Sequence, residues 1–139
     1  MFKKILVPLD GSKLAEGILP QVEQLAKIHG SEVTLLRVAL EHIFEGTDPI
    51  EHQVKMVREA ENYLAKVEAN LKKTGLKVNS VVRYGQDAQE IVDHARERGF
   101  DLIAMYTHGR TGIKQWVLGS VANKVLGASS VPVLLCRAC

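Results

Sequence analysis

The apolar positions of this chain follow two alternating patterns. Five short apolar runs, each bounded by polar or turn-forming residues, are typical of strands buried in a parallel sheet. They lie at residues 5–9, 32–39, 78–84, 101–106 and 131–136. Between them, apolar residues recur at intervals of three and four, which indicates amphipathic helices with one face in the core. These helical segments cover residues 12–30, 50–71, 87–99 and 119–126.

Capping and turn residues support these boundaries. Ser12 is placed to cap the first helix, and Gly30 closes it as a C-terminal glycine does. Pro20 lies inside that helix and predicts a bend or a shortened first turn. Asp87, with Glu90 three residues later, resembles a capping box at the start of the third helix.

The regular alternation of strand and helix predicts a doubly wound α/β fold. Right-handed crossovers between parallel strands place the helices on both faces of the sheet. With 139 residues, 46% of them hydrophobic, the chain has the size of one domain with one core. We therefore expect a single domain over residues 1–139.

Charge and hydropathy narrow the possible partners. The 18 Lys and Arg residues nearly balance the 16 Asp and Glu residues, and the net charge of +2 does not indicate nucleic-acid binding. No apolar stretch is long enough to cross a bilayer, and Met1 leads directly into a strand without a signal-peptide core. We expect a cytoplasmic protein that binds neither nucleic acid nor a membrane.

Two groups of residues contain side chains that can bind a metal, but neither group has the spacing of a metal site. Cys136 and Cys139 have C-x-x-C spacing but end a strand, whereas a redox pair uses a helix N-terminus and structural zinc needs two further ligands. The polar connection after the second strand is longer than usual. Its acidic and histidine side chains lack the paired spacing of metal ligands; they are His42, Glu45, Asp48, Glu51 and His52.

Candidate chemistry gathers where strands end. Doubly wound folds bind ligands at the carboxyl ends of their strands, and Asp10-Gly11-Ser12 follows the first strand. After the fourth strand, residues 107–112 read T-H-G-R-T-G, and Gly119-Ser120 begins the next helix. Glycines allow close approach to an anion, and a helix N-terminus presents unpaired N–H groups. The sequence therefore predicts a phosphate-binding loop, with Arg110 and Lys114 as candidates for added charge.

Four motifs together resemble the universal stress protein family. They are V-P-L-D-G-S near the start, T-H-G-R-T-G after the fourth strand, then G-S-V-A-N-K-V-L, and V-P-V-L-L at the end. They occur in the family's order and span essentially the whole chain. The resemblance implies a homodimer and a five-stranded parallel sheet in the order 3-2-1-4-5, with helices on both faces. In the family's ATP-binding branch, the signature is G-x-x-G, nine residues, then G-S or G-T.

One position departs from that signature. Its second glycine falls on Gly109, and Gly119-Ser120 completes it after nine residues, but its first glycine falls on Tyr106. By resemblance, this position lies against the ribose and the α-phosphate. We therefore expect Tyr106 to crowd the nucleotide and weaken its binding, unless the ring points to the opposite face of the sheet.

The resemblance also implies ligand roles beyond the glycines. Asp10 would accept hydrogen bonds from the ribose hydroxyls, although its alternative role is an Asx-turn that caps the first helix. The backbone of Val38 would meet adenine, and His108 either touches a phosphate or only shapes its loop. The candidate nucleotide-binding residues are Asp10, Ser12, Val38, His108, Gly109, Arg110, Gly119, Ser120 and Val121. The implied ligand is ATP or AMP, with Mg or Mn bound through the phosphates.

Three functions remain open. The expected one is a stress-response regulatory protein that binds ATP or AMP and acts as a dimeric switch on a further, unknown protein. A slow ATPase would need a positioned base or nucleophile near the phosphates, which the sequence does not show. The third is a dimeric interaction protein that binds no nucleotide, which remains an alternative because Tyr106 replaces the first glycine of the signature. In the implied strand order, the apolar strand 131–136 lies at an open edge, where we expect it to form the homodimer.

Overall fold

The computed structural model describes residues 1–40, 46, 48–107 and 119–137, and within them strands and helices alternate as predicted. The strands are β1 (Lys4–Pro8), β2 (Glu32–Leu40), β3 (Lys77–Gly85), β4 (Leu102–Thr107) and β5 (Val133–Arg137). The helices are the short 3₁₀ helix η1 (Ala15–Ile18) and the α-helices α1 (Leu19–His29), α2 (Pro49–Lys72), α3 (Asp87–Glu97) and α4 (Ser120–Ala128).

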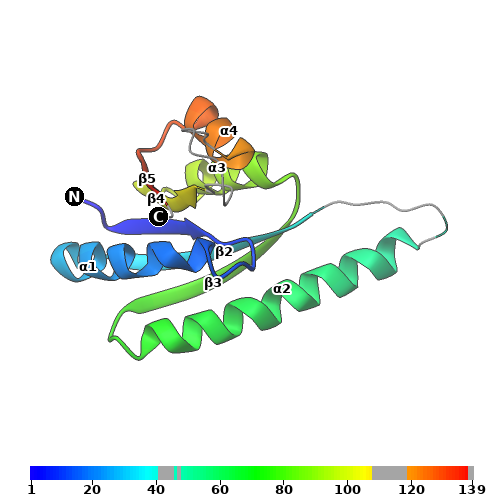
Figure 1. The fold of residues 1–139 in the computed structure, drawn as a ribbon, viewed down its shortest axis with the longest axis horizontal. Coiled ribbons are helices and arrows are strands. Elements are labelled where there is room, and N and C mark those ends of the chain that lie inside the picture. The colour runs from blue at the N-terminus through cyan, green and yellow to red at the C-terminus, as the bar shows by residue number, and fades with distance from the viewer. Residues whose placement is uncertain (41–45, 47, 108–118, 138–139) are drawn as a thin grey trace.

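The strands form one parallel sheet in the order β3-β2-β1-β4-β5. In Figure 1, α1 and α2 lie below this sheet, and α3 and α4 lie above it. The doubly wound fold and the strand order 3-2-1-4-5 are therefore confirmed. Because the chain runs outward from β1 in both directions, the strand order reverses between β1 and β4, where such folds form a crevice at the carboxyl edge.

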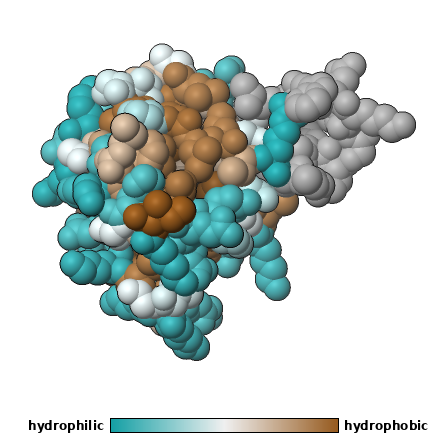
Figure 2. Space-filling view, turned by 90° about the vertical axis from the view of Figure 1, so that its left-hand side faces the viewer, coloured by the Kyte–Doolittle hydropathy of each residue, from teal (hydrophilic) through white to brown (hydrophobic). Residues whose placement is uncertain are grey.

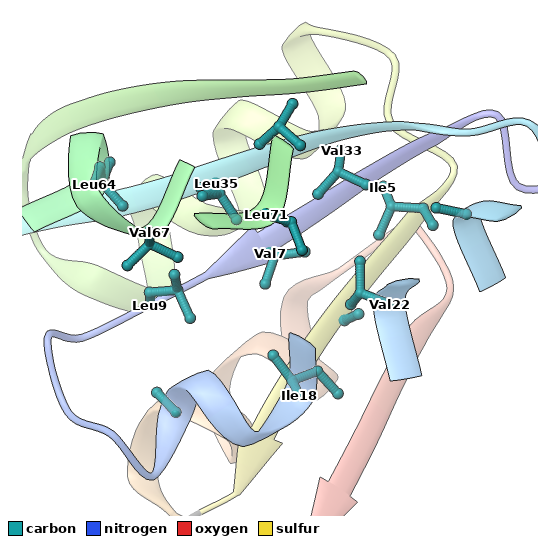
Figure 3. Close-up of a cluster of buried hydrophobic side chains, with 14 of the residues drawn as sticks. Ile5, Val7, Leu9, Ile18, Val22, Val33, Leu35, Leu64, Val67 and Leu71 are labelled. Atoms are coloured by element: carbon teal, nitrogen blue, oxygen red, sulfur yellow. The ribbon is translucent and has the colours of Figure 1, made fainter. Parts of the chain in front are cut away.

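Alternate residues of the central strands supply two separate cores. Ile5 and Val7 of β1 face α1 and α2, where they pack with buried side chains such as Leu64 (Figure 3). Leu6, between them, faces the opposite way and packs with residues of α3 and α4. Successive side chains of a strand point to opposite faces, so a strand that is buried on both faces reads as one continuous apolar run.

The first predicted helix is divided in two between Ile18 and Leu19, just before Pro20. This residue takes the second position of α1, where its missing N–H costs no hydrogen bond, and the turn before it is the 3₁₀ helix η1. The Ser12 hydroxyl accepts a hydrogen bond from the backbone N–H of Ala15 at 3.1 Å, so it caps the start of η1 as predicted. Gly30 ends α1 in the left-handed conformation, with φ of 65°.

Helix α2 begins where the sequence predicts and is the longest helix of the described chain. Asp48 caps it by accepting from the backbone N–H of Ile50 at 3.0 Å. Figure 1 shows its N-terminal part extending beyond the sheet, and Ile50 and Val54 in that part are exposed. None of the helices in the described part of the chain combines the length and the apolar character of a membrane span.

The predicted capping box at the start of α3 is wrong. Asp87 accepts from the adjacent backbone N–H of Ala88 at 2.7 Å, while Glu90 accepts from Arg83 of β3 at 2.5 Å. Arg83 also bonds to Glu97 at 3.3 Å. A charge-assisted hydrogen bond from a guanidinium to a carboxylate is stronger than one from a backbone amide, which explains why Glu90 pairs with Arg83 and not with the helix N-terminus.

A buried histidine belongs to the same group. The side chain of His94 is 6% exposed, and its Nδ1 atom lies 3.1 Å from Arg83 Nη1. Because a guanidinium only donates, Nδ1 accepts this bond and the ring is neutral. Burial lowers the pKa of His94, and the charges of Arg83, Arg98 and Lys4 lower it further.

Acidification is therefore expected to destabilise the fold through His94. Its pKa is lower in the folded chain than the unfolded value of 6.5, so below this pH the unfolded state binds the extra proton. The free energy of unfolding should fall with decreasing pH below about 6.5, by at most about 1.4 kcal/mol per pH unit from this group. Urea unfolding of wild type and His94→Gln at a series of pH values measures the effect. Parallel curves for the two proteins would contradict it.

Candidate functional site

A cavity of about 240 Å³ opens at the carboxyl edge of the sheet, at the point where the strand order reverses. Strands β1 and β2, helices α2, α3 and α4, and the end of β4 all contribute to its wall. Its lining includes Asp10, Arg37, Val38, Tyr106, Gly119, Ser120 and Val121. Apolar side chains such as Met56, Ile91 and Met105 complete the wall, which is the usual composition of a small-molecule site.

Asp10 forms the Asx-turn considered for it, and its side chain also lines the cavity. Its Oδ1 atom accepts from the backbone N–H of Ser12 at 2.9 Å and from the Ser12 hydroxyl at 2.5 Å, so the Asx-turn is present. The same side chain is exposed and lines the cavity. A carboxylate has about four acceptor positions, and the turn uses only part of them. Ser12 is not among the cavity-lining residues of the described chain, and its hydroxyl holds Asp10 in place.

The N-terminus of α4 supplies backbone donors to the wall. Gly119 is the N-cap residue, and Gly119, Ser120 and Val121 all line the cavity. The carbonyl of Gly119 accepts the first hydrogen bond of the helix, from the backbone N–H of Asn123 at 2.9 Å. The preceding N–H groups of a first helical turn have no partner within the helix, so this end favours an anion.

Three of the predicted site residues, His108, Gly109 and Arg110, lie outside the described residues. Asp10, Val38, Gly119, Ser120 and Val121 are brought together around one cavity although they come from three different parts of the chain.

Arg37 is a residue of this wall that sequence reasoning missed. It lies in β2 next to Val38, and its guanidinium carbon lies 5.5 Å from the centroid of the Tyr63 ring of α2. The Tyr63 hydroxyl donates to Glu16 Oε2 at 3.0 Å. Burial and this bond raise the pKa of Tyr63, so its hydroxyl stays protonated. In the sequence, a charged residue inside the apolar run of β2 was the signal that could have pointed to a position in the cavity wall.

The Tyr106 ring lies on the face of the sheet opposite α4. It packs with the core group that includes Val7 and Ile18, whereas the neighbouring Met105 packs with the group on the α3 and α4 side. A Cβ atom on Gly17 of η1 would lie 2.5 Å from the ring atom Cε2, so only glycine fits beneath the ring. Of the two orientations considered for Tyr106, the structure has the ring on the face of the sheet opposite α4.

Removing the Tyr106 ring is expected to destabilise the fold. Tyr106→Gly leaves a gap against Gly17 and places a glycine in a strand, for an expected cost of about 2–4 kcal/mol. Tyr106→Phe keeps the packing and is the matched control, with an expected cost below about 1 kcal/mol. Urea unfolding of both variants measures these costs, and equal costs would contradict the packing argument. Calorimetry with ATP on the same two proteins tests whether this orientation avoids crowding: tighter binding of ATP to Tyr106→Gly would show that the ring still crowds the nucleotide.

A doubly wound α/β domain with a cavity at its switch point is a small-molecule-binding fold, and comparison with known proteins identifies its family. The model of the universal stress protein family matches residues 1–137, and the chain belongs to this family. It is 33% identical to universal stress protein MJ0577 of Methanocaldococcus jannaschii, over 99% of this chain and 96% of that protein. It is 31% identical to universal stress protein YxiE of Bacillus subtilis, over 99% of this chain and all of that one.

Solved structures agree with this assignment. The structure of MJ0577 superposes with a TM-score of 0.88 at 35% identity, covering 100% of this chain and 98% of that one. Two more distant structures share the fold. A universal stress protein from Archaeoglobus fulgidus was solved in complex with dAMP; it has a TM-score of 0.72 at 22% identity, covering 97% of this chain and 98% of that one. Another universal stress protein was solved in complex with cAMP; it has a TM-score of 0.66 at 21% identity, covering 99% of this chain and 98% of that one.

Proposed function

We propose that this chain binds ATP or AMP in the cavity at the switch point and acts as a dimeric regulatory switch in a cytoplasmic stress response. The observation that carries the proposal is the convergence of Asp10, Val38 and the N-terminus of α4 on one cavity. An acceptor for ribose, a strand backbone beside an apolar wall for the base, and a helix end for phosphates are the three elements that an adenine nucleotide needs.

Each part of the nucleotide has a matching part of the wall. Adenine would lie against the backbone of Val38 and the apolar side chains, with the ribose at Asp10 and the phosphates at Gly119, Ser120 and Val121. Universal stress proteins solved with cAMP and dAMP support an adenine nucleotide as the ligand class. No group of three metal-binding side chains occurs among the described residues, so Mg or Mn would be held chiefly through the phosphates.

A thermal shift assay tests the proposal. ATP with magnesium, at about one hundred times its dissociation constant, should stabilise the protein by roughly 2.7 kcal/mol, and AMP should stabilise it when it is the ligand instead. GTP at the same concentration controls for nonspecific binding of a charged nucleotide. If neither ATP nor AMP shifts the melting temperature at millimolar concentration, the nucleotide proposal is wrong, and an interaction protein without nucleotide becomes the better explanation.

A further inference from the structure

Helix α3 carries both a part of the cavity wall and a cluster of polar side chains. Asp87 and Ile91 of this helix line the cavity. Glu90, His94 and Glu97 follow one another at intervals of four and three residues, so they lie on one face of the helix. A shift of α3 relative to the sheet would therefore change the cluster and the cavity wall together.

A single side chain of the sheet contacts all three residues of this cluster. The guanidinium of Arg83 in β3 donates to Glu90 at 2.5 Å and to Glu97 at 3.3 Å. Its Nη1 atom also donates to Nδ1 of His94 at 3.1 Å. Two of the four buried apolar residues of α3 are alanines, which remove little apolar area from water. The Arg83 side chain is therefore one of the main contacts that hold α3 on the sheet.

The contact with His94 exists only while the imidazole is neutral. Protonation turns Nδ1 into a donor, and a guanidinium has no acceptor to offer, so the hydrogen bond is lost and two cations face each other. Arg98 and Lys4 add further positive charge around the ring. Glu97 favours the charged ring, but its side chain is 52% exposed and already bonded to the guanidinium. Protonation of His94 therefore disfavours the attached position of α3.

We propose that the contact between His94 and Arg83 is acid-sensitive, so that protonation releases α3 from β3, loosens the cavity wall and weakens nucleotide binding. In the released state the ring is solvated and has its ordinary pKa of about 6.5, above the lowered pKa of the attached state. The released state binds the extra proton, so it becomes more populated as the pH falls below about 6.5. The effect on binding rests on the nucleotide site proposed above, whereas the release of α3 does not.

Hydrogen exchange of the backbone amides, followed by NMR without nucleotide and corrected for intrinsic exchange rates, tests the release. Between pH 7.5 and 5.0, protection of Ile91 to Ala95 should fall by about 10- to 30-fold in wild type, because one proton shifts an equilibrium by at most tenfold per pH unit below about 6.5. His94→Gln keeps an acceptor for Arg83 and takes up no proton, so its protection should fall much less. His29→Gln removes a histidine at the end of α1 and should behave as wild type does.

Calorimetry with ATP and magnesium at the same two pH values tests the effect on the cavity. Wild type should lose several-fold more affinity on acidification than His94→Gln, whose own change measures the titration of the nucleotide. Equal losses of affinity in the two proteins would overturn the inference. Absence of ATP binding at pH 7.5 would overturn the proposed function, and hydrogen exchange would then decide the release of α3 by itself.

Hydrogen exchange also distinguishes release of α3 from opening of the whole chain. If the amides of α3 are as well protected as those of the central strand β1 in wild type at pH 5.0, the helix does not open separately and the inference is wrong. Equal losses of protection in wild type and His94→Gln would contradict it as well. If circular dichroism shows His94→Gln unfolded, Arg83→Gln removes the neighbouring cation instead and should show the same reduced loss.

Discussion

Replacing Gly119 with valine is expected to abolish the thermal shift produced by ATP and to leave the fold intact. Gly119 lines the cavity at the N-terminus of α4, where a branched side chain would occupy the space that we propose for the phosphates. Its backbone has φ of −57° and ψ of 151°, which any residue adopts, so valine introduces no backbone strain. With ATP at about one hundred times the wild-type dissociation constant, the expected loss is the whole of the roughly 2.7 kcal/mol of stabilisation that the ligand supplies.

Gly127 offers a matched control on the same helix. It is exposed, and a Cβ atom added there has no neighbour within 4 Å, so Gly127→Val makes the same chemical change away from the cavity. The control should retain the ATP-induced shift, and circular dichroism should show both variants folded. Unchanged ATP affinity in Gly119→Val would show that the phosphates do not lie at this end of α4.

A second large effect, on the oligomeric state, is expected from substitutions in the edge strand β5, which we propose as the homodimer interface. In the described part of the chain β5 pairs with β4 alone, and its residues Val133 to Cys136 are all partly exposed. Figure 2 views the side where β5 lies in Figure 1 and shows a broad apolar area bordered by hydrophilic residues. An unprotected apolar edge of this kind favours pairing with a second copy about a twofold axis.

Pro132 lies immediately before β5 and not within it. Its carbonyl accepts from the backbone N–H of Ile103 at 2.9 Å, so the backbone of Pro132 faces β4. Alternate residues of a strand direct their backbone groups to opposite sides. The backbone groups of Leu134 therefore face β4, whereas those of Val133 and Leu135 face the open edge.

Charge at the interface should separate the subunits. Val133→Glu and Leu135→Glu bury a carboxylate among apolar groups, so sedimentation should report monomer or unfolded protein for at least one of them. Both side chains also pack against the core group on the α3 and α4 side, so circular dichroism is needed to distinguish the two results. Leu135→Pro removes an outward-facing donor that forms no hydrogen bond among the described residues, so, where circular dichroism shows it folded, it should sediment as a monomer. Wild type that sediments as a monomer at micromolar concentration would refute the proposed interface.

The amino-acid sequence by itself determined the elements and their arrangement. The five apolar runs and the helical periodicity between them depend only on near neighbours in the chain, and all of these elements are present in the structure. Regular alternation with right-handed crossovers then allows few sheet topologies, and the family motifs selected the observed one. The same motifs named Asp10, Val38 and Gly119, which the fold brings together in one cavity.

Only the tertiary structure decided which partner each polar side chain takes. Glu90 has the spacing of a capping box, but its carboxylate accepts a hydrogen bond from Arg83 of a neighbouring strand instead. Arg37, Gly11 and Tyr63 lie far apart in the sequence, and no local pattern indicates that they meet beside Asp10. Spacing along the chain predicts contacts within one element, because helix and strand geometry fix them. Contacts between elements depend on packing distance and on competition among all nearby donors and acceptors, which exist only once the chain is folded.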